Sequence, residues 1–229
     1  MDRRFVGRLY TRVLHKYFLR DLWFDLQLEA KREAVDYIKA HLRDAAPRRD
    51  RDDLLDFAAE RARAEGLGGL VCEFGVSGGK SIRRLAGGFP QVHGFDSFEG
   101  LPEDWSGTRE TRGRFSQKGR LPKVPANARL HPGWFENSLP PFLETHPGPA
   151  SLLHLDADLY SSTNTVLSLM TPRIRPGTIL LFDEYLGYWN WRAHEYRALQ
   201  EWVRESGATY SYIGFNTSGG QVAVRVDTI

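Results

Sequence analysis

The sequence predicts an α/β protein with a doubly wound, Rossmann-like sheet, and two observations lead to this fold class. From about residue 69 onward, short apolar runs alternate with helical segments, which is typical of parallel strands joined by helices. Residues 70–81 and 92–96 also read as strand, tight glycine turn, helix, strand and acid. We expect seven mostly parallel strands that end in an antiparallel hairpin, with ligands at the carboxyl ends of the parallel strands.

A helical extension, residues 1–50, is expected to precede this domain of residues 51–229. Apolar side chains recur at helical spacing over residues 5–18, among six basic residues in the first twenty, and a second helical stretch covers about 24–42. Too little chain lies nearby to cover the apolar stripe. We therefore expect residues 1–45 to pack on another subunit and to help close the active site, with membrane-surface binding as the alternative.

The remaining elements follow from apolar runs and turn residues. A helix from Leu54 to Glu65 is expected between the charged turn 47–53 and Gly66. The polar segment from Arg109 to Pro125 is expected to be a mobile loop. The expected strands are residues 69–76, 91–98, 128–131, 150–156 and 178–183 and a hairpin of 210–215 and 221–226, with helices starting near Gly79, Leu139, Ser162 and Trp191.

Length and composition fit one enzyme-sized domain. The chain has 229 residues, of which 41% are hydrophobic, so it can bury a substantial core. A formal net charge of only +2 argues against a dedicated nucleic-acid-binding protein. The single cysteine, Cys72, lies in an expected buried strand and can form no intrachain disulfide, which is usual in a reducing compartment. The chain has no apolar run of 18 residues and no signal peptide, so we expect a soluble, cytoplasmic protein.

The glycine turn after the strand at residue 70 is the first candidate binding site. The pattern acid-x-Gly-x-small-x-Gly is formed by Glu73, Gly75, Ser77 and Gly79. Asp96 closes the next strand, 21 positions after Gly75. An acid at that position can hydrogen-bond both hydroxyls of a ribose, while the glycine turn lets a ligand approach the backbone. The turn therefore predicts a ligand that carries a nucleoside.

Two better-known phosphate-binding motifs do not fit the same turn. A P-loop needs a glycine five residues before Gly79, where the chain has Phe74. The dinucleotide pattern G-x-G-x-x-G fails because Ser77 stands at its second glycine. The structural alternative is that any strand-to-helix turn in an α/β domain attracts glycines.

Carboxylates end two of the apolar strands. Asp156 and Asp158 follow one apolar run, and Asp183 and Glu184 follow another. If these are neighbouring parallel strands, four acids meet beside the ligand, where their repulsion calls for a cation. A hard divalent ion such as magnesium would supply it. The alternative is that Asp158 or Ser161 caps the following helix while some of the acids face solvent.

Other side chains are weaker candidates. Ser81, at the start of an expected helix, could bind a carboxylate of the ligand or simply cap the helix. His154 lies within an apolar strand, which is more typical of a hydrogen-bonded core histidine than of a base. Tryptophans near expected loops could stack on an adenine or a sugar ring, or pack in the core; these are Trp105, Trp134, Trp189 and Trp191.

Five motifs between about residues 70 and 190 follow one another in a specific order and spacing. They are Glu73-Phe74-Gly75-Val76, the run from Gly94 to Pro102, Gly133-Trp134-Phe135, the run from Asp156 to Thr163, and Asp183-Glu184-Tyr185. Together they resemble the macrocin O-methyltransferase (TylF/MycF-type) family of class I S-adenosylmethionine-dependent methyltransferases. This family methylates hydroxyls of sugars on natural products such as macrolides and aminocoumarins, using S-adenosylmethionine and Mg²⁺.

The resemblance implies a Mg²⁺-dependent O-methyltransferase that acts on a hydroxyl of a sugar or glycosylated natural product. It implies that Asp156 is both a metal ligand and the general base, with Asp183 and Glu184 as the other protein ligands. The family often has two aspartates before the tyrosine, and the longer Glu184 side chain could shift the ion. The residues that we expect to bind S-adenosylmethionine are Glu73, Gly75, Val76, Ser77, Gly79, Ser81, Asp96, Ser97, Trp134, Asp156 and Asp158.

Two other functions are compatible with the same motifs. A metal-dependent methyltransferase for catechols would also hold vicinal oxygens on an ion. A non-catalytic nucleoside-binding module could keep the fold, although it has no need of four carboxylates beside the ligand. We expect a small-molecule hydroxyl acceptor and a homo-oligomer, and neither a nucleic acid nor a membrane as partner. The acceptor itself is not readable from the sequence.

Overall fold

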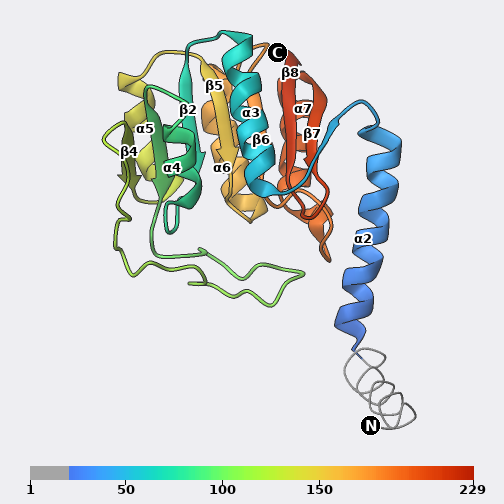
Figure 1. Ribbon diagram of the computed structural model, residues 1–229. Coiled ribbons are helices and arrows are strands. Elements are labelled where there is room, and N and C mark those ends of the chain that lie inside the picture. The colour runs from blue at the N-terminus through green and yellow to red at the C-terminus, as the bar shows by residue number, and fades with distance from the viewer. Residues whose placement is uncertain (1–20) are drawn as a thin grey trace, which may run out of the picture.

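An eight-stranded sheet with helices on both faces forms the body of residues 21–229, the part of the chain that the computed structural model describes (Figure 1). The order of the strands is β1-β7-β8-β6-β5-β2-β3-β4. Neighbouring strands are parallel except β8, which is antiparallel to both β6 and β7. The predicted fold class is thus confirmed. The strands are β1 (Ala46–Arg48), β2 (Leu70–Phe74), β3 (Val92–Asp96), β4 (Ala128–Pro132), β5 (Ala150–Leu155), β6 (Ile179–Phe182), β7 (Thr209–Asn216) and β8 (Val222–Thr228).

The helices begin and end at residues whose chemistry suits a terminus. Asp50 caps α3 by accepting a hydrogen bond from the backbone N–H of Asp53 at 2.9 Å, and Gly66 and Gly207 end α3 and α7 in the left-handed conformation. The helices are α2 (Leu22–His41), α3 (Arg51–Glu65), α4 (Lys80–Ala86), α5 (Phe135–Thr145), α6 (Tyr160–Met170) and α7 (Glu195–Ser206), with 3₁₀ turns η1 (Thr171–Arg173) and η2 (Trp191–Ala193).

Alternate residues of the buried strands face opposite layers of helices. In β6, Ile179 and Leu181 pack in the apolar cluster that includes residues of α3 and α4. Leu180 and Phe182 pack in the cluster that includes residues of α2, α5, α6 and α7. This period of two is the geometry of an extended strand, so each face of the sheet needs its own helical cover.

The chain leaves β2 in one direction across the sheet and returns on its other side. From β2 it passes through α4 to β3 and then β4, whereas β5 and β6 lie beyond the opposite edge of β2. Connections that diverge in this way leave a crevice at the carboxyl ends of β2 and β5. The fold therefore places the predicted glycine turn and the ends of the two acid-bearing strands at one crevice.

The structure differs from expectation at several element boundaries. The sheet has eight strands instead of seven, because residues 46–48 pair with Gly214, Phe215 and Asn216 of β7; the turn expected from residue 47 instead begins after this strand. Helix α5 begins at Phe135, four residues before the predicted start, and continues through Pro140 and Pro141.

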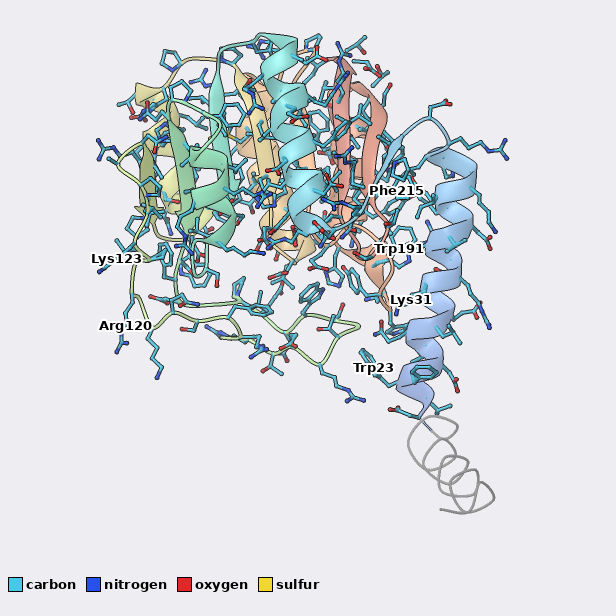
Figure 2. The ribbon with its side chains drawn as sticks, viewed as in Figure 1. Trp23, Lys31, Arg120, Lys123, Trp191 and Phe215 are labelled. Atoms are coloured by element: carbon cyan, nitrogen blue, oxygen red, sulfur yellow. The ribbon has the colours of Figure 1, made fainter. Side chains whose placement is uncertain are left out.

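Helix α2 runs beside the β1–β7 edge of the sheet (Figure 1). Tyr37 anchors it: its hydroxyl lies 2.6 Å from the hydroxyl of Tyr212, and its ring centroid lies 5.6 Å from that of Trp191, which Figure 2 shows between α2 and the sheet. Leu22 and Val35, in contrast, are 77% and 49% exposed. The predicted stripe over residues 5–18 lies outside the described residues, and the subunit contact stays a prediction.

The segment between β3 and β4 is irregular and runs along the side of the sheet at which the strands end. Figure 2 shows Arg120 and Lys123 on it. Backbone hydrogen bonds join two parts of this segment. The N–H of Leu101 donates to the carbonyl oxygen of Arg114 at 2.9 Å, and the N–H of Gly113 donates to the carbonyl oxygen of Leu101 at 2.9 Å. Its predicted mobility stays a prediction. Among residues 21–229, no helix combines the length and the apolar character needed to cross a bilayer.

Candidate functional site

A cavity of about 870 Å³ opens at the carboxyl ends of β2, β3, β5 and β6. This is the crevice that the strand order predicts for a doubly wound sheet. Residues that directly follow each of these strands contribute to its wall: Gly75 after β2, Ser97 after β3, Asp156 after β5 and Asp183 after β6. The topology thus gathers in one place side chains that lie more than a hundred positions apart in the sequence.

The glycine turn is shaped by close packing against the strand next to it. Gly75 has a φ of +93°, and a side-chain carbon at this position would lie 1.7 Å from the backbone oxygen of Asp156. Only glycine fits such a position, because any side chain would collide with β5 and favour a different backbone conformation. The wall of the cavity here is therefore backbone, as close approach of a ligand requires.

Asp96 fastens the turn to the end of β3. One carboxylate oxygen, Oδ2, accepts hydrogen bonds from the backbone N–H groups of Val76 at 2.8 Å and Ser77 at 2.7 Å. The other, Oδ1, accepts from the N–H of Phe98 at 2.6 Å. The acid predicted to contact a ribose thus also organises the backbone around it, and it lines the cavity.

The predicted cofactor-binding residues divide into two groups. Glu73 is fully buried and is not part of the wall, and Ser81 is buried within α4. Val76 and Gly79 are not in the wall either; the first donates its N–H to Asp96, and the second precedes α4. Those that line the cavity are Gly75, Ser77, Asp96, Ser97, Trp134, Asp156 and Asp158.

Only two of the four candidate tryptophans line the cavity. Trp105 and Trp134 line the cavity, so both can face a ring of a ligand. Trp191 is 1% exposed and packs in the core, and Trp189 is 39% exposed and not in the wall.

All four predicted carboxylates lie in the cavity wall. Burial, followed by the charge of Asp183, raises the pKa of Asp156 to about 7 and that of Glu184 to about 8. Burial likewise holds the pKa of Asp158 well above its usual range. Burial acts in the same direction on Asp183, but His154 and Arg51 outweigh it, and the pKa of Asp183 is lowered. Burial and the neighbouring acids therefore disfavour the charged forms of Asp156, Asp158 and Glu184, and Arg51 does not offset this.

His154 lies behind the cavity wall and is wholly enclosed. Its Nδ1 lies 3.0 Å from Oε2 of Glu73, and its Nε2 lies 3.4 Å from Oδ1 of Asp183. Burial alone would lower its pKa, but the hydrogen bonds to Asp183 and Glu73 raise it to about 10. His154 is thus a hydrogen-bonded core histidine between two acids, and Glu73 is one of its partners.

Arg51 also contacts Asp183, and its role is not apparent from the sequence. It is the first residue of α3, and its Nε donates to Oδ1 of Asp183 at 2.6 Å while Nη2 donates to Oδ2 of Asp156. The two aspartates follow it by 105 and 132 positions. No local pattern marks this arginine, because its role depends on where the sheet brings α3.

The cavity also includes side chains from the irregular segment after β3. Arg112 and Phe115, which belong to the predicted loop, line it together with Leu101. The loop was singled out from its polar composition, but which of its residues face the site follows only from the fold.

The donor set suits a hard divalent ion. Ligand atoms of His154, Asp156 and Asp183 lie within 4.8 Å of one another, and the Glu184 carboxyl group lines the same cavity. Carboxylate oxygens are the ligands that Mg²⁺ prefers, whereas both nitrogens of His154 are already engaged. Asp156 and Asp183 therefore fit Mg²⁺ by chemistry, provided that Arg51 releases them, whereas Glu184 lies outside this close group and stays a predicted ligand.

A comparison with protein families matches residues 72–185 to a methyltransferase domain. Among curated proteins, the 8-demethyl-8-(2,3-dimethoxy-α-L-rhamnosyl)-tetracenomycin-C 4'-O-methyltransferase of Streptomyces olivaceus is 30% identical over 162 residues. The match covers 58% of this chain and 59% of that relative. The chain thus matches less than two thirds of the relative's length.

Solved structures share the fold. The calicheamicin methyltransferase CalS11 superposes with a TM-score of 0.60 at 22% identity, covering 77% of this chain and 80% of that one. The O-methyltransferase NovP superposes with a TM-score of 0.59 at 21% identity, covering 78% and 79%. At this level of identity the likeness supports a shared fold and nothing more specific.

Proposed function

Residues 72–185 belong to the methyltransferase domain family, as the motifs in the sequence indicated, and on that premise we propose that this protein is an S-adenosylmethionine-dependent O-methyltransferase. The proposed acceptor is a hydroxyl of a sugar or of a glycosylated natural product, and the proposed metal cofactor is Mg²⁺. Support for the acceptor class comes from the tetracenomycin relative, whose name specifies methylation of a rhamnosyl group.

One observation carries the proposal. The same cavity is lined by a backbone turn held by Asp96 and by the carboxyl groups of Asp156, Asp158, Asp183 and Glu184. The turn offers a place for a nucleoside and the acids offer a place for a metal ion and a proton acceptor. A methyl donor and a hydroxyl acceptor can therefore meet within one cavity.

On the donor side, we assign the cavity-lining residues Gly75, Ser77, Asp96, Ser97 and Trp134 to S-adenosylmethionine. Residues behind the wall are assigned a positioning role, since they hold the turn and the strand ends in place. These are Glu73, Val76, Gly79 and Ser81.

On the acceptor side, we propose Asp156 as the general base. The acceptor oxygen forms a bond to the methyl carbon as the bond from carbon to the sulfonium sulfur breaks, and the hydroxyl proton passes to the carboxylate. The sulfur keeps the electron pair and leaves as S-adenosylhomocysteine. When bound, Mg²⁺ would lower the pKa of the acceptor hydroxyl. The chain would otherwise act by holding the two reactants in line and by excluding water.

Asp158 is an alternative base that the structure brings forward. It lines the cavity, and its carboxyl group has no hydrogen-bond partner within residues 21–229, whereas Asp156 is engaged by Arg51. Its φ of +61° is tolerated by asparagine and aspartate better than by most residues, so Asp158→Asn is a conservative test.

Titration calorimetry with S-adenosylmethionine and S-adenosylhomocysteine tests the proposal at its first step. We expect micromolar affinity, about −8 kcal/mol. ATP in the same cell should bind weakly or not at all. Tight binding of ATP, or no binding of either sulfur compound, would contradict the proposed function.

A further inference from the structure

Arg51 joins the two strand ends that the proposed metal site needs. Its Nε and Nη2 lie on the same edge of the guanidinium group, and each donates to a different aspartate. The group therefore lies between Asp156, after β5, and Asp183, after β6. An ion that used the same two carboxylate oxygens would have to take its place.

Two basic side chains contact Asp183, and they differ in their freedom to leave. His154 is 1% exposed and is held on both sides, by Glu73 and by Asp183. The Arg51 side chain is 33% exposed and lines the cavity. Its backbone is fixed at the start of α3 by the Asp50 cap, so only the long side chain is free to turn away.

Acidic residues outnumber basic ones in the lining of the cavity. The acids are Asp96, Glu136, Asp156, Asp158, Asp183 and Glu184, and the basic residues are Arg51 and Arg112. Exchange of Arg51 for a divalent ion would raise the positive charge between Asp156 and Asp183 by one unit. It would also leave the guanidinium group free to reach solvent, where it is well hydrated.

We infer that Arg51 is a displaceable internal cation: it neutralises Asp156 and Asp183 in the metal-free protein and must release both for a divalent ion to bind. This inference rests on the proposed function, because it takes the two aspartates as the ion's ligands. If Arg51 must leave, the measured affinity for the metal ion depends on how easily this arginine is displaced as well as on the two carboxylates.

Calorimetry of Mg²⁺ and Mn²⁺ binding, without acceptor, tests the competition. Arg51→Gln should bind either ion at least tenfold more tightly than the wild type, because it removes the competing charge. Arg51→Lys should also gain affinity, since lysine keeps the charge but cannot bond both aspartates in a planar fork. The matched control is Arg49→Gln, which removes the same charge from a side chain that is 85% exposed and pairs with Asp53; it should bind as the wild type does.

Nitrogen-15 NMR of arginine side chains tests the release directly in the wild type. The signal of the Arg51 Nε–H group is identified as the one that Arg51→Lys lacks. In the metal-free protein this proton should exchange slowly with water, because Asp183 accepts its hydrogen bond. Saturating Mg²⁺ should move that signal and speed its exchange. A signal that stays unchanged at saturation would overturn the inference even if an Arg51 variant failed to fold.

The failures of the two proposals are distinguishable. Equal ion affinity in wild type and Arg51→Gln would overturn the displacement and leave the metal site in place. No ion binding in either protein would overturn both the displacement and the Mg²⁺ part of the proposed function. S-Adenosylmethionine binding by the same samples then shows whether the methyl-donor site stands by itself.

Discussion

Gly75→Ala is expected to damage both the stability and the site. The methyl carbon would lie 1.7 Å from the backbone oxygen of Asp156. The backbone segments at residues 75 and 156 must therefore move apart by more than 1 Å to reach the 3.0 Å that real contacts tolerate. A φ of +93° adds roughly 1–3 kcal/mol for a residue other than glycine. The shift also strains the 2.8 Å hydrogen bond from the Asp156 N–H to Phe74, worth about 1 kcal/mol. We expect a loss of about 3–5 kcal/mol in the free energy of unfolding.

Urea unfolding of this variant beside Gly78→Ala checks the magnitude. Gly78 lies in the same turn, but a side-chain carbon there would meet nothing within 4 Å, and its φ is not in the left-handed region. Gly78→Ala should therefore change stability by less than about 1 kcal/mol. If the two variants unfold within about 1 kcal/mol of each other, the close contact between β2 and β5 does not shape the turn. Calorimetry with S-adenosylhomocysteine should show binding for Gly78→Ala and a large loss for Gly75→Ala.

Four further outcomes follow from the same geometry. Asp156→Asn should lower turnover by at least ~10²-fold and Asp158→Asn by less, in a methyl-transfer assay; the reverse order would make Asp158 the base. EDTA should abolish transfer while calorimetry still shows S-adenosylmethionine binding, and full activity in EDTA would exclude the metal requirement. Asp96→Ala should weaken that binding by roughly 2 kcal/mol, because the ribose contact and the anchor of the turn are lost together; unchanged affinity would remove Asp96 from the site. Burial, followed by the charge of His131, lowers the pKa of His93 from 6.5 to about 4, so the unfolded chain takes up the proton first as the pH falls. Stability present above pH 6.5 should be lost toward pH 4, by on the order of 3 kcal/mol more in wild type than in His93→Asn, and equal losses in urea unfolding would contradict this.

Much of the site could be predicted because it lies at the ends of parallel strands. Gly75, Asp156 and Asp183 each follow an apolar strand and Asp96 ends one, and the geometry of a doubly wound sheet brings such positions together. Local sequence therefore carried the information in these cases. The chemistry of each residue type then indicated what it could bind.

The parts that could not be predicted depend on pairings between distant segments. Strand β1 has only three residues and is defined by β7, more than 160 positions later, so its own sequence reads as a charged turn. Arg51 gains its role from the position of α3 against the sheet. Glu73 has the spacing of a ligand-binding acid but faces His154, and strand alternation alone did not reveal that partner.

Transfer of an isotope-labelled methyl group from S-adenosylmethionine tests the central claim most directly. The purified protein with Mg²⁺ is incubated with a panel of glycosylated natural products, free sugars and catechols, and the products are analysed by mass spectrometry and NMR. We predict the label on a sugar hydroxyl, as an ether that Asp156→Asn fails to form. Label found only on catechols would contradict the proposed acceptor. Bound S-adenosylmethionine with no transfer to any member of the panel would instead favour a binding module over an enzyme.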